Sequence, residues 1–196
     1  MNGGLRMASL ADYIYEVKLG KDPNIDKIFN EALKQVFSDR YFNKIENKLT
    51  KRIDVIEKKG PANTVAWNKG TTIFINPNEF NKRDMKNKMK YLLHEFLHVL
   101  QHSKSGMFMR DFKELRNLSR KLFSISKKYT KDVGLFLTGK KVPGRFINHE
   151  EALSYLMNDS IQWNQINAKG RKVFLNELQK SGIFDLSSNF WRSRLQ

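Results

Sequence analysis

The run His94-Glu95-Phe96-Leu97-His98 places two histidines four residues apart, with a glutamate directly after the first. Side chains at positions i and i+4 lie on the same face of an α-helix, so both imidazoles can reach one Zn²⁺ at about 2.0–2.1 Å. The glutamate then lies beside the metal, where its carboxylate can take a proton from a bound water. We therefore expect a helix that carries a zinc centre, with His94 and His98 as ligands and Glu95 as catalytic base.

The residues around this motif have the period of an amphipathic helix. The apolar side chains that fall on one side of it are Leu92, Leu93, Phe96, Leu97 and Leu100. This spacing predicts a helix from about Lys82 or Asp84 to about Ser103, and Gly106 is expected to end it. An ordinary helix, with two histidines at its surface or at the edge of the core, is the alternative interpretation.

Helical and strand periods follow one another along the chain in an order that predicts the fold class. The expected helices lie near residues 10–17, 22–36, 41–49, 112–125, 148–161 and 171–181. The expected strands lie at 53–57, 64–67 and 71–75, and the last two flank a turn at Asn68-Lys69-Gly70. This order predicts an α+β fold, with a small antiparallel or mixed sheet, then the motif helix, then a helical C-terminal part.

The length of 196 residues suits one domain with a sizeable core and is short for two. We expect a single domain over residues 1–196. Its N-terminal helices occupy residues 1–50, the sheet and the motif helix occupy 51–105, and the helical part that supplies a third metal ligand occupies 106–196.

The chain has no cysteine, so a metal must be held by histidines and carboxylates. The absence of disulfides favours an intracellular or particle-enclosed protein over a secreted one. Residues 1–15 have no long apolar core and carry Arg6 and Asp12, unlike a signal peptide. No apolar run approaches the length of a membrane span. We expect a protein of the cytoplasm or of the inside of a viral particle, without a membrane partner.

A large excess of positive charge bears on the partners of the chain. It has 36 Lys and Arg against 20 Asp and Glu, a formal charge of +16. Such an excess favours an anionic partner, either nucleic acid or an acidic protein. Because the basic residues are spread along the chain, a solvated lysine-rich surface is the alternative.

Two segments resemble the strand and the active-site helix of zincin metallopeptidases, namely Thr71-Thr72-Ile73-Phe74-Ile75-Asn76 and residues 91–102. They are most similar to gluzincins and to the compact ImmA/IrrE-like peptidases of phages and bacteria. In those families a glutamate from a later helix is the third metal ligand. In thermolysin-like members this glutamate lies in the pattern Asn-Glu-x-x-Ser-Asp. In ImmA-like members it lies in a Glu-Ala pair that is followed by an aromatic residue. The run His149-Glu150-Glu151-Ala152-Leu153-Ser154-Tyr155 contains both partial patterns.

Glu151 is the third ligand that we expect. Ala152 follows it directly and Ser154 follows at the matching offset, so it fits both family patterns. Asn148 can cap this helix, and a glutamate three residues later can serve a capping box alone, which is the alternative role for Glu151.

Other residues near the motif are alternates. Glu150 is the second choice for the ligand, and His149 is a candidate donor to the transition state. Tyr155 stands where thermolysin-like enzymes have an aspartate behind the ligands. His102 lies two turns beyond His94, about 12 Å along the helix axis, so one ion cannot easily join both.

The resemblance also implies that the strand with Thr72, Ile73 and Phe74 is an edge strand along the cleft. A substrate peptide would then pair with its backbone. A central position in the sheet is the alternative.

Three functions therefore compete. The first is a zinc metallopeptidase that hydrolyses the peptide bonds of a protein or peptide through a water activated by Glu95. The second is a structural or assembly protein, for example a phage-particle component, built on a zincin fold with a retained or vestigial zinc site. The third is a basic nucleic-acid-associated protein whose metal is structural. The charge of +16 suits the second, and the intact Glu95 favours the first.

Overall fold

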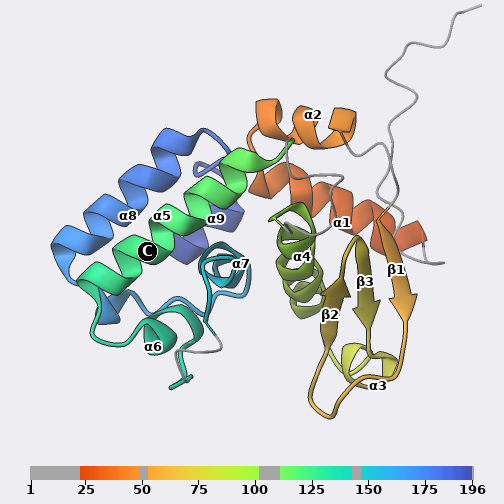
Figure 1. The fold of residues 1–196 in the computed structure, drawn as a ribbon. Coiled ribbons are helices and arrows are strands. Elements are labelled where there is room, and N and C mark those ends of the chain that lie inside the picture. The colour runs from red at the N-terminus through yellow and green to blue at the C-terminus, as the bar shows by residue number, and fades with distance from the viewer. Residues whose placement is uncertain (1–22, 49–52, 102–110, 143–146, 196) are drawn as a thin grey trace, which may run out of the picture.

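The computed structural model describes residues 23–48, 53–101, 111–142 and 147–195. Within them the fold is α+β, as predicted, with a three-stranded mixed sheet to one side of a larger helical part (Figure 1). The helix expected near residues 10–17 lies outside the described residues.

Two helices precede the sheet, where apolar residues recur at helical spacing. They are α1 (Pro23–Val36) and α2 (Asp39–Lys48). Phe29, Leu33 and Val36 lie on one face of α1 and are buried. Burial of this apolar face, rather than intrinsic helix propensity, supplies most of the stability of such a helix.

The sheet has the strand order β1-β3-β2. Its strands are β1 (Asp54–Glu57), β2 (Ala66–Lys69) and β3 (Thr72–Ile75). β3 pairs with β1 in parallel and with β2 in antiparallel orientation. A turn joins β2 and β3 as predicted, but it lies at Gly70 and Thr71, because Asn68 and Lys69 belong to β2 and pair with β3. Gly70 supplies the left-handed backbone of this turn with a φ of 64°.

The strand that carries Thr72, Ile73 and Phe74 is the central strand, so our expectation of an edge strand is wrong. β3 is paired on both sides, and its backbone has no free edge for a substrate peptide. Ile73 of this strand is fully buried. The run of apolar and threonine residues indicates a strand, but it does not encode the strand's neighbours. The edge strand that contacts the motif helix is β2.

The motif helix α4 (Met85–Gln101) lies between the sheet and the helical part (Figure 1). It follows the short helix α3 (Pro77–Phe80). At the start of α4, the Asp84 side chain accepts a hydrogen bond from the Asn87 N–H. α4 contacts α1, β2, β3 and α7. Because these neighbours surround it, every residue from Leu92 to Gln101 is buried.

The helical part is built from six segments around an aromatic centre. They are α5 (Lys113–Tyr129), α6 (Val133–Thr138), α7 (Glu151–Met157), the 3₁₀ turn η4 (Trp163–Gln165), α8 (Ala168–Ser181) and α9 (Asn189–Leu195). Phe136, Trp163 and Phe174 meet edge to face, with ring centroids 5.6–5.9 Å apart. α8 comes so close to α5 that a Cβ at Gly170 would lie 2.3 Å from that of Tyr129.

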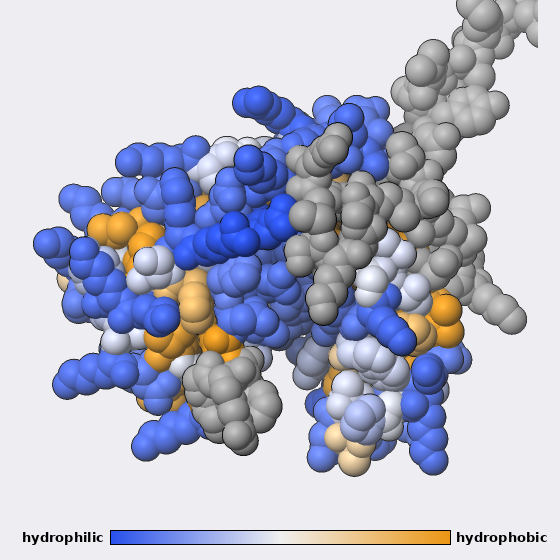
Figure 2. All heavy atoms as spheres, viewed as in Figure 1, coloured by the Kyte–Doolittle hydropathy of each residue, from blue (hydrophilic) through white to orange (hydrophobic). Residues whose placement is uncertain are grey.

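The sheet side and the helical part share one continuous core. Trp191 of α9 is fully buried and donates a hydrogen bond to the Val36 carbonyl of α1 at 2.7 Å, which joins the end of the chain to its first described helix. Hydrophilic residues cover much of the face seen in Figure 2. None of the helices within the described ranges combines the length and the apolar character that a membrane crossing requires.

Candidate metal centre

Helix α4 brings His94 and His98 together, one turn apart on its buried face. Their Nε2 atoms lie 3.1 Å from each other and their ring centroids 4.7 Å. The side chains are almost fully shielded from solvent, with 9% and 8% of the residue surface exposed. Two imidazole nitrogens that face each other at this distance are arranged to share one proton or one cation.

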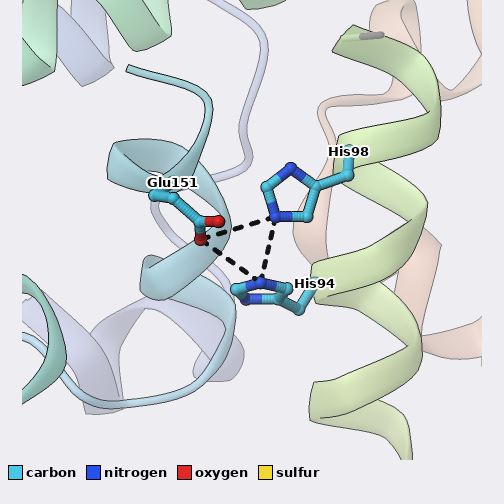
Figure 3. Close-up of side chains that lie close together, drawn as sticks. All are labelled: His94, His98 and Glu151. Atoms are coloured by element: carbon cyan, nitrogen blue, oxygen red, sulfur yellow. Dashed lines mark hydrogen bonds and ion pairs between the residues drawn. The ribbon is translucent and has the colours of Figure 1, made fainter. Parts of the chain in front are cut away.

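Helix α7 adds a carboxylate to this pair. Oε2 of Glu151 lies 3.5 Å from Nε2 of His94 and 3.5 Å from Nε2 of His98 (Figure 3). This oxygen is buried and has no hydrogen-bond partner among the described residues. The three residues lie close enough together to hold a metal ion.

The three donor atoms of the triangle are spaced like the ligand atoms of a tetrahedral metal ion. Ligand atoms about 2.1 Å from a tetrahedral ion lie about 3.4 Å from one another. The three edges measured here are 3.1, 3.5 and 3.5 Å. The donor atoms therefore already stand at the spacing of three corners of a tetrahedron, and the residues present fit a tetrahedral metal ion.

The start of α7 is fixed so that Glu151 faces α4. The Oδ1 atom of Asn148 accepts hydrogen bonds from the N–H groups of Glu150 at 2.8 Å and Glu151 at 3.2 Å. The next residues, Ala152 and Leu153, are fully buried and dock the helix. Asn148 thus caps the helix as predicted, but the Glu151 carboxylate lies at the imidazoles.

The charges of the triangle are coupled. Burial is the main reason that the pKa of His94 falls to about 3, and the neighbouring His98 adds to it. Burial alone would lower the pKa of His98 too, but the Glu151 carboxylate 3.5 Å away and the other nearby carboxylates raise that pKa. Burial likewise opposes ionisation of Glu151, yet His98 and His94 lower the pKa of its carboxyl group. The triangle thus favours a carboxylate balanced by a positive charge.

Glu95 lies beside the triangle and is oriented by the sheet. Burial raises the pKa of its carboxyl group to about 7, with an opposing effect from His98. A backbone hydrogen bond from Asn68 of β2 holds the carboxylate. Next to the β2–β3 ladder, the Asn76 N–H donates a hydrogen bond to the Val65 carbonyl. Because hydrogen-bonded and non-hydrogen-bonded pairs alternate, the N–H of Asn68 points away from β3, on the outer side of β2.

A second layer of polar groups surrounds His94. Nδ2 of Asn158 lies 3.1 Å from Nδ1 of His94, and the imidazole also hydrogen-bonds the backbone of Ser154. The Tyr155 ring meets the His94 ring edge to face at 5.3 Å. Groups of this kind fix the orientation and tautomer of a ligating histidine.

The alternates lie outside the triangle, or outside the described residues in the case of His102. The His149 carbonyl accepts a hydrogen bond from Ser119, and its Nε2 is buried without a hydrogen-bond partner among described residues. The Glu150 carbonyl accepts hydrogen bonds from Gln101 and Ser154. Tyr155 lies beside the triangle, against His94.

Asn158 and Asn68 were not predicted as site residues from the sequence. A signal for Asn158 was available, because Glu151, Tyr155 and Asn158 are spaced i, i+4 and i+7, which places them on one helical face. Asn68 acts through its backbone N–H, so its residue type carries no signal.

Comparison of the chain with protein-family models, with curated proteins and with solved structures finds no match in any of the three. The function must therefore be inferred from the geometry of the site.

Proposed function

We propose that the protein is a zinc-dependent metallopeptidase with a zincin-like arrangement of its sheet and motif helix. The observation that carries this proposal is the triangle of His94, His98 and Glu151 with the carboxylate of Glu95 beside it. Two imidazoles and one carboxylate are a donor set that catalytic zinc sites use, and three protein ligands leave a fourth position open. When bound, zinc would lower the pKa of a coordinated water and polarise a carbonyl group.

The protein's own groups have separate roles in this proposal. Glu95 accepts the proton of the attacking water and later delivers it to the leaving amine. Its pKa of about 7 is suited to both tasks near neutral pH. Tyr155 has its pKa raised to about 12 by burial and by Glu151 and Glu95, so its hydroxyl stays protonated and can donate a hydrogen bond to a developing oxyanion.

The outer edge of β2 is suited to a peptide substrate. Alternation along the β2–β3 ladder directs the backbone polar groups of Ala66 and Asn68 away from β3. The Asn68 N–H is taken by Glu95, which leaves its carbonyl and the groups of Ala66 for an added strand. A peptide that pairs there passes next to the catalytic base, so β2 takes the role that we had expected of β3.

Cleavage of peptides by the zinc-loaded full chain tests the proposal. The protein is incubated with a broad peptide library, and products are identified by mass spectrometry. We expect cleavage that stops with a chelator and returns with one equivalent of zinc. His98→Ala, purified in the same way, should cleave nothing, which controls for contaminating peptidases. A zinc-loaded protein that cleaves no peptide would contradict the proposal and favour the structural or assembly protein.

A further inference from the structure

A pocket of about 350 Å³ lies beside the metal centre, between the first half of α4, the end of α6 and the end of α7. Its volume falls within the range of about 300–1,000 Å³ that is usual for ligand pockets. In the space-filling view, the surface is hollowed between the sheet and the α6 end of the helical part (Figure 2). The pocket is large enough for one substrate side chain.

Two residues form both the wall of this pocket and the surroundings of the metal triangle. Tyr155 lines the pocket, and its ring packs against His94. Asn158 lines the pocket, and its side-chain amide lies 3.1 Å from the same imidazole. The pocket therefore adjoins His94 on the side of its Nδ1 atom, one imidazole ring away from the Nε2 atom that faces the triangle.

The pocket is positively charged. It is lined by Lys90 and Lys140, and none of the described residues that line it is acidic. Lys90 is held in an ion pair, because its Nζ lies 2.6 Å from Oδ2 of Asp159, and the other oxygen of that carboxylate lies 2.5 Å from Nε of Arg194. Lys140 forms no ion pair with the described residues.

The backbone of Lys140 is held in place. Gly139 ends α6 with a left-handed φ of 69°, and the Thr138 hydroxyl bonds to both the N–H and the carbonyl of Lys140, at 3.2 and 3.0 Å. The Lys140 backbone is therefore fixed at the rim of the pocket, and its exposed, flexible side chain can bring the ammonium group to a ligand there.

We infer that this pocket binds an acidic side chain of the substrate, with Lys140 as the residue that determines the preference. The inference rests on the proposed peptidase function and names its substrate class, peptides with Glu or Asp beside the scissile bond. The charge of +16 acts in the same direction, because it attracts acidic proteins.

Two peptidyl hydroxamates test the inference through binding alone. They differ only in the side chain next to the hydroxamate, which is Glu in one and Gln in the other, so their shapes match and their charges do not. Zinc-loaded wild type should bind the Glu probe about fivefold more tightly, as expected for a partly exposed ion pair. Lys140→Glu should reverse this preference. Lys141→Glu, an equal charge change at an exposed residue outside the pocket, should keep it.

Equal affinity of the wild type for the two probes would overturn the inference, and so would an equal effect of the two substitutions. Failure of both probes to bind would also overturn it, because the pocket would then not be reached from the metal.

The same preference should appear in the cleavage sites of the peptide library. Cleavage without it would overturn the inference and leave the peptidase. A Glu preference in binding, with no cleavage of any peptide, would support the pocket and contradict the peptidase.

Discussion

Replacing Glu95 with glutamine is expected to leave zinc binding intact and to slow peptide cleavage by about 10²–10⁴-fold, the usual contribution of general acid–base catalysis. Glutamine has the same shape and can accept the Asn68 N–H hydrogen bond through its carbonyl oxygen. It cannot take a proton from water at neutral pH. The loss should therefore appear in kcat, measured with a peptide from the library.

Glu79→Gln is the matched control for this substitution. Glu79 lies on α3 and pairs with Lys82 at 2.9 Å, away from the triangle. It should leave both zinc content and cleavage unchanged. Equal cleavage rates for wild type and Glu95→Gln, with zinc bound in both, would show that Glu95 is not the base.

Replacing Glu151 with alanine is expected to weaken zinc binding by more than about 100-fold, since loss of groups that merely support metal ligands costs about 10–100-fold. The substitution removes one of three donor atoms and leaves two imidazoles 3.1 Å apart. The affinity is measured by competition with a chromophoric chelator.

The neighbouring Glu150 provides the comparison. It lies outside the triangle, so Glu150→Ala should change the zinc affinity by less than about threefold. Because Asn148 caps α7 in both variants, both should keep the helix, which far-UV circular dichroism checks. Glu151→Gln preserves side-chain shape and should also weaken zinc binding. Wild-type affinity in Glu151→Ala would show that the third ligand lies elsewhere.

The sequence predicted the parts of the fold that have long, regular periods. α4 and α5 are 17-residue helices, and their apolar spacing was sufficient to locate them. α6 and α9 have only six and seven residues, less than two full turns, so no period could be recognised. α7 is shorter than predicted because the chain turns at Asp159, whose φ is 53°.

The site was predictable where its residues are close in the sequence. His94, Glu95 and His98 lie within about one helical turn, so their proximity could be predicted directly. Glu151 is 53 positions from His98 and could be chosen only because it matches the family patterns. Asn148, three residues before it, left a capping role for Glu151 open as the alternative. Only the packing of α7 on α4 places the carboxylate at the imidazoles.

The order of the strands could not be read from the sequence. β3 follows β2 through a tight turn, and that adjacency was predicted. The parallel pairing of β3 with β1 is a contact between segments separated by the whole of β2. It makes β3 central and β2 the edge, and it brings the Asn68 N–H to Glu95.

Zinc K-edge X-ray absorption on protein loaded with one equivalent of zinc tests the metal centre most directly. We predict tight binding of one ion per chain, in a four-coordinate shell of two imidazole nitrogens, one carboxylate oxygen and one further light atom. Those ligands should lie at about 2.0–2.2 Å. Weak, substoichiometric binding, or a six-coordinate shell of oxygen atoms without imidazole scattering, would contradict it.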